Sequence, residues 1–222
     1  MSLVSNLFLL FVAASILIYY IVPRKSQWIV LLIFSYLYYI AGGPRYVVFI
    51  LFSTLVTWLM ALLIEKAEGK ENHKGARKLL ILGLILNFGM LGIVKYTNFA
   101  VENINALLHL NLRGIQLLLP LGISFYTFQS SGYLLDVYWK RCKAERHPLK
   151  YALFVSFFPQ ILQGPIGRYS RLADQLYAEH RFEGNNIIRG FERILWGFFK
   201  KMILADWAAV FADAIFEDPA KY

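Results

Sequence analysis

The sequence predicts an all-α membrane protein: a polytopic helical bundle with an interfacial helix and a re-entrant segment that contains proline and glycine. Two observations predict it. The 222 residues are 58% hydrophobic and only 17% charged, whereas soluble domains average about 45–50% apolar and about 25% charged residues. Before Glu65 the only charged side chains are Arg24, Lys25 and Arg45. A soluble core offers too little interior to hide so long a stretch with so little charge.

Five apolar runs are candidate membrane spans, because about 20 apolar residues cross about 30 Å of hydrocarbon as a helix. Short polar or turn-forming breaks separate them, such as the basic break that begins at Pro23 and the turn signal at Gly42-Gly43-Pro44. The predicted spans cover residues 3–22, 28–41, 46–64, 79–96 and 116–139.

The basic residues predict an orientation. Loops 23–27, 65–78 and 140–150 hold twelve lysines and arginines, and the opposite side holds three. Because short cytoplasmic loops are enriched in Lys and Arg, we expect a multi-pass protein of the cell (inner) membrane with an extracytoplasmic N-terminus. The net charge of +9 follows from this bias, so we expect the lipid bilayer and no nucleic acid as a partner. No cofactor or metal is predicted, and the one cysteine excludes a cysteine cluster.

Residues 99–112 predict an amphipathic helix on the outer surface. Val101, Ile104, Leu107 and Leu108 recur near helical spacing, and polar residues separate them.

Polar side chains interrupt the last predicted span. On a helix Gln129, Tyr133 and Asp136 share one face, and Ser124, Thr127 and Ser131 share another. Small polar residues can serve close helix packing alone, but an amide in hydrocarbon needs hydrogen-bond partners. Asp136 can equally be paired and hydrated at the inner interface.

Residues 151–167 carry no charge, yet they contain Pro159, Gly164, Pro165 and Gly167. Irregular backbone at membrane depth is tolerated only inside protein or beside a water-filled cavity. We therefore predict a re-entrant segment that lines a cavity, with an ordinary proline-kinked span as the alternative.

Residues 191–217 are expected to form a helix that is too charged to face lipid on all sides. Asp206 and Asp213 share a face of it, and their role is left open.

The chain contains the motifs LPLGISFYTFQ at 119–129 with YLLDVY at 133–138, FFPQILQGPIGRY at 157–169, FSYLYYIAGGP at 34–44, and the shorter segments SNLFL at 5–9 and KYTNF at 95–99. These motifs resemble the membrane-bound O-acyltransferase family, in its bacterial branch that acetylates alginate and related exopolysaccharides. The resemblance runs over essentially the whole chain, in order. Gln163 stands where that branch would have a small residue.

The resemblance implies an enzyme that moves an acyl group from a donor on the cytoplasmic side to an extracytoplasmic hydroxyl through a tunnel. It also implies a catalytic histidine in a tryptophan-rich region downstream of Tyr222. None of His73, His109, His147 and His180 matches that histidine. We therefore expect the chain to be the N-terminal part of one acyltransferase domain, without a catalytic residue and inactive alone.

Six residues are the candidate cavity lining, predicted from the polar interruptions and the resemblance: Gln129, Pro159, Gln160, Gly164, Pro165 and Arg168. Arg168 could hold a donor phosphate, since a guanidinium fork matches phosphate geometry, or it could only anchor the topology.

Two other functions fit the sequence. Broken helices also suit a transporter or flippase-like protein, and a chain complete at 222 residues would suit a non-catalytic membrane partner. The expected partners of an acyltransferase are the acyl donor and extracytoplasmic polysaccharide-modifying proteins. The sequence leaves the acyl chain, the donor and the acceptor polymer open.

Overall fold

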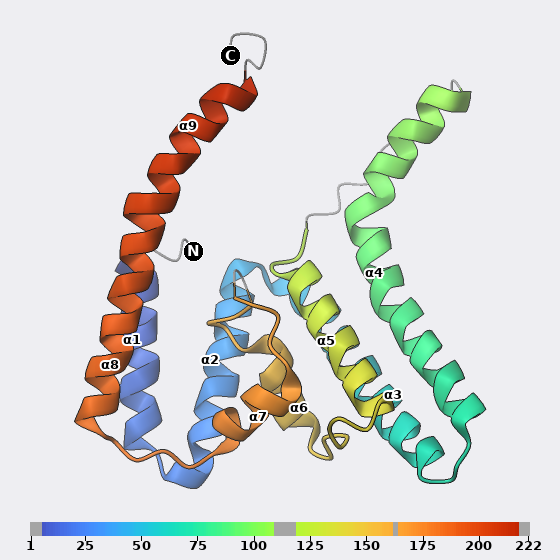
Figure 1. Cartoon of the computed structure of the whole chain (residues 1–222), viewed down its shortest axis with the longest axis horizontal. Coiled ribbons are helices and arrows are strands. Elements are labelled where there is room, and N and C mark those ends of the chain that lie inside the picture. Colours follow the sequence, from blue (N-terminus) through green and yellow to red (C-terminus); the bar gives the residue numbers. More distant parts are fainter. Residues whose placement is uncertain (1–5, 109–118, 162–163, 218–222) are drawn as a thin grey trace. The chain divides into compact units, whose positions relative to one another are not determined.

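The computed structural model describes residues 6–108, 119–161 and 164–217, and every regular element in them is helical (Figure 1). The chain divides into two compact units, Met1–His180 and Arg181–Tyr222, and each is described by itself. The predicted all-α class is confirmed for these residues.

The first unit contains seven α-helices in its described residues. They are α1 (Asn6–Ile21), α2 (Gln27–Gly42), α3 (Val47–Glu68), α4 (His73–Leu108), α5 (Ile123–Tyr138), α6 (Pro148–Ser156) and α7 (Tyr169–Tyr177). Short 3-10 turns, Arg24–Ser26 and Pro44–Tyr46, lead into α2 and α3. Both turns follow a proline or glycine break in the sequence, where a helix lacks a donor or gains backbone freedom.

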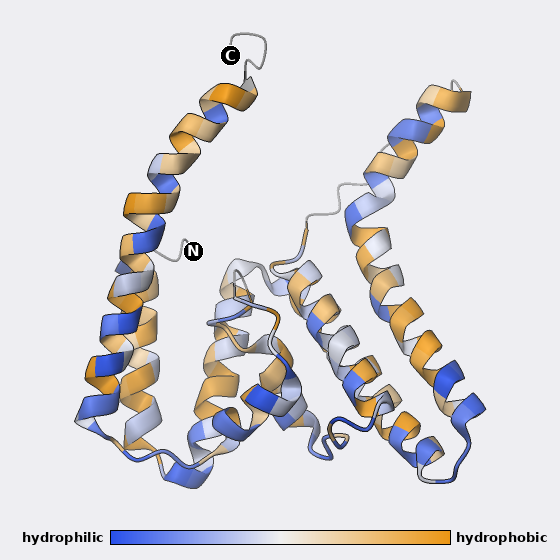
Figure 2. Cartoon of the chain, in the orientation of Figure 1, coloured by the Kyte–Doolittle hydropathy of each residue, from blue (hydrophilic) through white to orange (hydrophobic). Residues whose placement is uncertain are grey.

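Two helical stretches are long and apolar enough to cross a membrane, Pro44–Glu68 and His73–Leu108, while α1 is apolar but shorter. About a third or less of the most apolar window in each is buried. A core helix of a soluble protein would be mostly buried, whereas here large apolar side chains such as Leu55, Leu59 and Ile85 are exposed. Figure 2 shows that hydrophobic residues run along much of the length of these helices, and hydrocarbon is the environment that such surfaces fit.

Helix α4 differs from the sequence-based expectation. A span at 79–96 and a separate surface helix at 99–112 were expected, but one unbroken helix runs over 36 residues to Leu108, about 54 Å. No proline or glycine lies between Lys95 and Leu108 to end it, and Asn103 Nδ2 donates to the Phe99 carbonyl one turn back at 2.7 Å. Residues 109–112 lie outside the described residues.

The start of α5 also differs from the expected start of the span 116–139. Residues 116–118 lie outside the described residues, and the helix begins only at Ile123. Gly122, with φ +67°, precedes it in the left-handed conformation that ends regular helix. A Cβ on Gly122 would lie 2.3 Å from the Ile161 carbonyl oxygen. The backbone of the 157–161 turn therefore packs directly against the first turn of α5.

A buried polar network joins α3 to α4. Asn87, which is 1% exposed, accepts a hydrogen bond from Ser53 Oγ at 2.6 Å and donates to Thr57 Oγ1 at 3.0 Å. Its Nδ2 also donates to the Gly83 carbonyl of its own helix at 2.9 Å. All the hydrogen-bonding groups of the amide are thus used, which is the condition for placing an amide in an apolar interior.

Residues 151–167 do not form a continuous helix. Helix α6 ends at Ser156 and, at nine residues, reaches only about 14 Å. Turns follow, with Gln160 N donating to the Phe157 carbonyl at 3.0 Å and Gly164 N to the Gln160 carbonyl at 3.1 Å. The first of these turns is held by Phe158 N, which donates to Ser35 Oγ of α2 at 3.2 Å.

The end of the first unit is fixed to the start of α2. Gln27, which is 2% exposed, donates from Nε2 to the His180 carbonyl at 3.0 Å and accepts from the His180 amide at 2.9 Å. Tyr19 of α1 also bonds the His180 ring, with 2.8 Å between its hydroxyl and Nδ1. The chain therefore leaves this unit at a fixed point.

The second unit is helical from Gly184 to Glu217, longer at its start than the expected helix 191–217. It comprises α8 (Gly184–Phe199), a π-helical segment (Lys200–Ala205) and α9 (Asp206–Glu217). Lys201 Nζ lies 2.7 Å from Asp206 Oδ2, and Asp213 is exposed.

We predict that Asn87→Ala lowers the free energy of unfolding by about 1–3 kcal/mol, because Ser53 and Thr57 lose their partner inside the helix pair. Unfolding of the purified protein in mixed micelles, with a denaturing detergent as the variable, measures it. Asn103→Ala, at an exposed site on the same helix, is the control and should cost under about 0.5 kcal/mol. An equal loss in both variants would show that the network contributes nothing particular.

We also predict that Gly122→Ala destabilises the protein by about 1–3 kcal/mol or more, since the positive φ is unfavourable for alanine and the new Cβ meets the Ile161 carbonyl. Gly132→Ala is the matched control on α5, where a Cβ has no heavy atom within 4 Å. There alanine should leave stability unchanged or raise it. Thermal unfolding of both variants in the same detergent checks this, and equal midpoints would contradict it.

Candidate functional site

A pocket of about 320 Å³ lies between α5 and the segment that leads into α7. It is lined by Gln129, Gly132, Tyr133, Leu135, Asp136, Trp139, Arg141, Ile166, Gly167 and Arg168. The two stretches of sequence that carry the polar interruptions thus meet at one place, although about 30 residues separate them.

Helix α5 presents three polar side chains to the pocket. Gln129, Tyr133 and Asp136 follow one another at helical spacing, as the sequence predicts. Gln129 is buried, and its Nε2 donates to the Phe154 carbonyl of α6 at 2.9 Å. The amide has the partner that burial requires, and it fixes the C-terminal end of α6 against α5.

Two arginines, Arg141 and Arg168, also line the pocket. Arg141 Nη1 lies 3.6 Å from Asp136 Oδ1, and the guanidinium stacks over the Trp139 ring at 4.6 Å. Arg168 is exposed and forms no ion pair with the described residues. Of the two cations, Arg168 is therefore the one whose charge is not offset by a neighbouring carboxylate.

The six predicted lining residues divide into two groups. Gln129 and Arg168 line the pocket, whereas Pro159, Gln160, Gly164 and Pro165 do not. Gln160 packs against the backbone of Gly164 and Gly167, because a Cβ on either glycine would lie 2.9 Å from an atom of Gln160. Its Oε1 is buried and has no hydrogen-bond partner in the part of the chain that the structure describes. Pro159 and Pro165 are exposed. Gln163 lies outside the described residues.

Glu145 holds the walls of the pocket together, and the sequence analysis did not single it out. Its Oε2 accepts a hydrogen bond from Tyr169 at 2.5 Å, and its backbone N–H donates to the Tyr133 hydroxyl at 2.8 Å. Its carbonyl accepts from Trp58 Nε1 of α3 at 2.9 Å. Tyr133 lines the pocket and Tyr169 follows Arg168, so this one residue connects α3, α5 and α7. In the sequence, Glu145 stands out only as the one acidic residue among the basic residues of 140–150.

The loop that contains Glu145, residues 139–147, is also bound by two carboxylates that belong to α3. Glu65 accepts a hydrogen bond from the Ala144 amide at 3.0 Å and pairs with Arg146. Glu68 lies 3.1 Å from Lys140 Nζ. Part of the positive charge that the sequence shows in this loop is therefore neutralised, and it serves to attach the loop to α3.

Burial raises the pKa of two groups beside the site. The pKa of the Cys142 thiol rises to about 11, first through burial and then through the negative charges of Asp136 and Glu65. Burial is also the main cause that raises the pKa of Tyr169. The Tyr169 hydroxyl therefore stays protonated and donates a hydrogen bond to Glu145. Cys142 stays a thiol at neutral pH, which makes it a poor nucleophile.

The histidines occupy other places. His73 bonds Glu68 at 2.9 Å, the His147 ring packs on Trp28 at 5.4 Å, and His180 bonds Tyr19. His109 lies outside the described residues. Within residues 6–108, 119–161 and 164–217 no three His, Cys, Asp or Glu side chains are grouped so that they could hold a metal ion.

The sequence is similar to bacterial O-acetylating proteins along almost its whole length. It is 34% identical over 219 residues to the probable alginate O-acetylase AlgI of Pseudomonas syringae pv. tomato and 34% identical over 220 residues to that of Pseudomonas aeruginosa, which covers 96% of the chain in each case. It is 33% identical over 216 residues, 86% of the chain, to the peptidoglycan O-acetyltransferase of Helicobacter pylori. The chain is homologous to these O-acetyltransferases.

The homology confirms the resemblance to the alginate O-acetyltransferases that the motifs show. The chain spans only about 40% of the length of these relatives, 41% for both AlgI proteins and 40% for the peptidoglycan enzyme. No protein-family model matches the chain, and no solved structure matches it with statistical significance. The homologous part includes the pocket and the loop that Glu145 anchors.

We predict that Cys142 of this O-acetyltransferase homologue reacts slowly with iodoacetamide. With a pKa of about 11 against an ordinary 9.0, its thiolate fraction at pH 8 is about 100-fold below that of a free cysteine. The labelling rate of the Cys142 peptide, followed by mass spectrometry, should rise tenfold per pH unit from pH 7 to 10. Asp136→Asn should raise the rate, because one of the two negative charges is removed. A plateau near pH 9, as in the unfolded chain, would contradict it.

Proposed function

We propose that this chain is part of an integral-membrane O-acyltransferase that moves an acyl group, in the simplest case acetyl, to hydroxyls of an extracytoplasmic polysaccharide. The homology to alginate and peptidoglycan O-acetylating proteins supports the chemistry. The two long apolar helices support the membrane setting. The twelve-to-three distribution of basic residues supports a multi-pass topology with the N-terminus outside.

The pocket beside Arg168 is the proposed contact with the acyl donor. Its guanidinium is exposed and has no carboxylate partner among the described residues, whereas Arg141 faces Asp136. A planar guanidinium can bind a phosphate with two parallel hydrogen bonds. In this proposal Arg168 holds an anionic group of the donor, which approaches from the cytoplasmic side.

The turns after α6 support the proposed re-entrant segment. A helix of nine residues cannot cross the bilayer, and the backbone that follows is irregular. Such backbone needs protein or water around it at membrane depth, and residues 166–168 line a pocket that can supply both.

The base for the reaction is proposed to come from a different part of the protein. General-base catalysis needs a group within hydrogen-bond reach of the acceptor hydroxyl, and no histidine is among the residues that line the pocket. The relatives are more than twice as long as their matched part, which leaves room for such a group. Extracytoplasmic polysaccharide-modifying proteins are proposed as partners.

The single observation that carries the site assignment is that Gln129 and Arg168 line one pocket. We predict that Arg168→Ala in the full-length enzyme lowers kcat/KM for the donor by about 10–100-fold, since a charge-assisted hydrogen bond contributes about 1.5–3 kcal/mol. Arg168→Lys should recover only part of it, because an ammonium group cannot bind phosphate with two parallel bonds. Acyl transfer in membrane vesicles measures both.

Arg171→Ala is the matched control for this experiment. Arg171 lies one turn further along the same segment, is exposed and does not line the pocket. If Arg171→Ala lowers activity as much as Arg168→Ala, the basic residues act through topology alone. Wild-type activity in both Arg168 variants, with normal assembly, would exclude the ligand role.

A further inference from the structure

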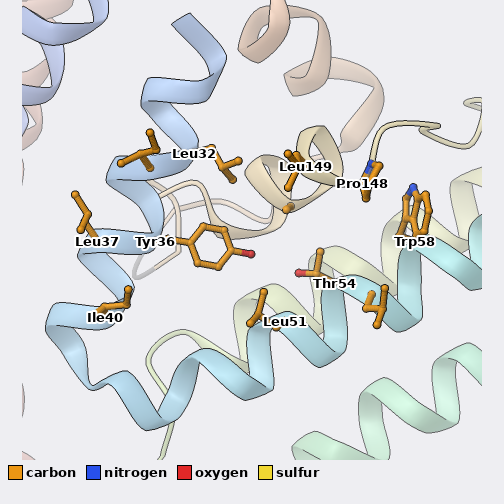
Figure 3. A pocket seen from close by; sticks show the side chains of 12 residues that line it. Leu32, Tyr36, Leu37, Ile40, Leu51, Thr54, Trp58, Pro148 and Leu149 are labelled. Atoms are coloured by element: carbon orange, nitrogen blue, oxygen red, sulfur yellow. The ribbon is translucent and has the colours of Figure 1, made fainter. Parts of the chain in front are cut away.

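A second and larger cavity lies away from the site described above. It is a groove of about 680 Å³ whose walls come from α2, α3 and α6 (Figure 3). Leu32 and Leu37 form one wall, Leu51, Leu55 and Trp58 form the other, and Leu149 closes the back. Helices α2 and α3 follow each other in the chain but meet mainly through α6, which contacts both. The groove fills the space where the two helices diverge.

The lining of the groove is almost entirely apolar. The hydroxyls of Tyr36 and Thr54 point toward each other from opposite walls (Figure 3), and the two side chains interact. Both oxygen atoms are buried. The rim is formed by exposed apolar residues such as Ile33 and Leu55, and α3 belongs to a helix that can cross a membrane. Hydrocarbon is therefore the solvent at its mouth.

The groove is long enough to hold part of an alkyl chain. Its α2 wall runs from Leu32 to Ile40, about 12 Å at 1.5 Å per residue, and a chain extended along this wall would meet mostly apolar side chains.

Two basic residues precede the helix that forms one wall of the groove, on the side where α6 begins. The Trp28 ring contacts the His147 ring at 5.4 Å, which brings the start of α2 beside the start of α6, where Pro148 lines the groove. Arg24 and Lys25 precede this part of α2, and neither forms an ion pair within the described part of the chain. Basic residues next to membrane helices attract anionic headgroups, and Trp28 and Trp58 are of the type found at the bilayer interface.

We propose that this groove binds one anionic phospholipid, with its acyl chains between α2 and α3 and its phosphate beside Arg24 and Lys25. The lipid would complete the packing of α6, which in turn leads into the irregular segment 157–167. This inference does not depend on the acyltransferase proposal, because it uses none of the residues that line the smaller pocket.

Photocrosslinking in the full-length protein tests the proposal. The protein is reconstituted in vesicles with a trace of phosphatidylglycerol that carries a diazirine in its acyl chain, or with phosphatidylcholine that carries the same chain. Crosslinked peptides are quantified by mass spectrometry. The expected result is that phosphatidylglycerol labels residues 51–58 and 148–152 several-fold more than phosphatidylcholine does. Equal labelling by both lipids, or labelling no higher than at the exposed Ile81 and Ile85 of α4, would overturn the proposal.

Two matched tryptophan variants locate the lipid. Leu55→Trp fills the groove from an exposed position, whereas Leu59→Trp lies one turn further along α3, is also exposed and does not line the groove. Of these two variants, only Leu55→Trp should reduce labelling of residues 148–152. Ile33→Trp, on the opposite wall of the groove, should reduce it as well. An equal reduction by Leu59→Trp, or none by either groove variant, would contradict the assigned place.

The headgroup and the chain are tested separately. Arg24→Gln and Lys25→Gln should each lower the preference for phosphatidylglycerol, by at most about five-fold, which is the attraction expected of one basic residue at the surface. Thr54→Val should leave labelling unchanged, because an alkyl chain makes no use of the hydroxyl. Loss of labelling in Thr54→Val, with an unchanged unfolding midpoint, would instead indicate a ligand with a polar group at this depth.

Discussion

Glu145 forms four hydrogen bonds, and three of them connect its loop to the helices α7, α5 and α3. Its carboxylate, amide and carbonyl are bonded to Tyr169, to Tyr133 and to Trp58, and its second carboxylate oxygen accepts from the His147 amide at 2.8 Å. These partners belong to α7, α5, α3 and the loop itself, so this one residue links the elements that surround the pocket. Glu65 and Glu68 of α3 then fasten the rest of the loop. The carboxylates therefore organise a loop whose sequence is dominated by positive charge.

A donor or acceptor that is buried between apolar helices needs a partner within the protein, because water cannot reach it. Asn87 and Gln129 meet this need in different ways. Asn87 uses its whole amide within the α3–α4 pair, as a purely structural group would. Gln129 donates to a main-chain carbonyl that belongs to a different element, at the point where the helical backbone is about to end. Its hydrogen bond thus supports irregular backbone beside a cavity.

Hydropathy and breaker residues predicted the helical class and the turn near Gly43, because those signals act within a few residues. The turn at Gly122 was missed, since this residue was placed inside the predicted span 116–139. Helical spacing also predicted that Gln129 and Asp136 share one face of a helix, and both line the smaller pocket together with Arg168. The continuous course of α4 was missed, since polarity after residue 96 marks a change of surroundings and leaves the helix itself intact. Glu145 was missed because its partners on the helices are 12 to 87 residues away in the sequence. Pro159 and Gln160 were placed in the lining because a broken helix does not reveal which of its sides faces the cavity.

The clamp between Gln27 and His180 has a consequence for the order of events during synthesis. Its two partners are 153 residues apart, and at about 5–20 residues per second the ribosome needs roughly 8–30 s to supply the second one. During that time the side chain of Gln27, buried in the finished protein, must be satisfied by water or by the insertion machinery. The first two helices can therefore enter the membrane early, but they reach their final packing only after residue 180 has emerged.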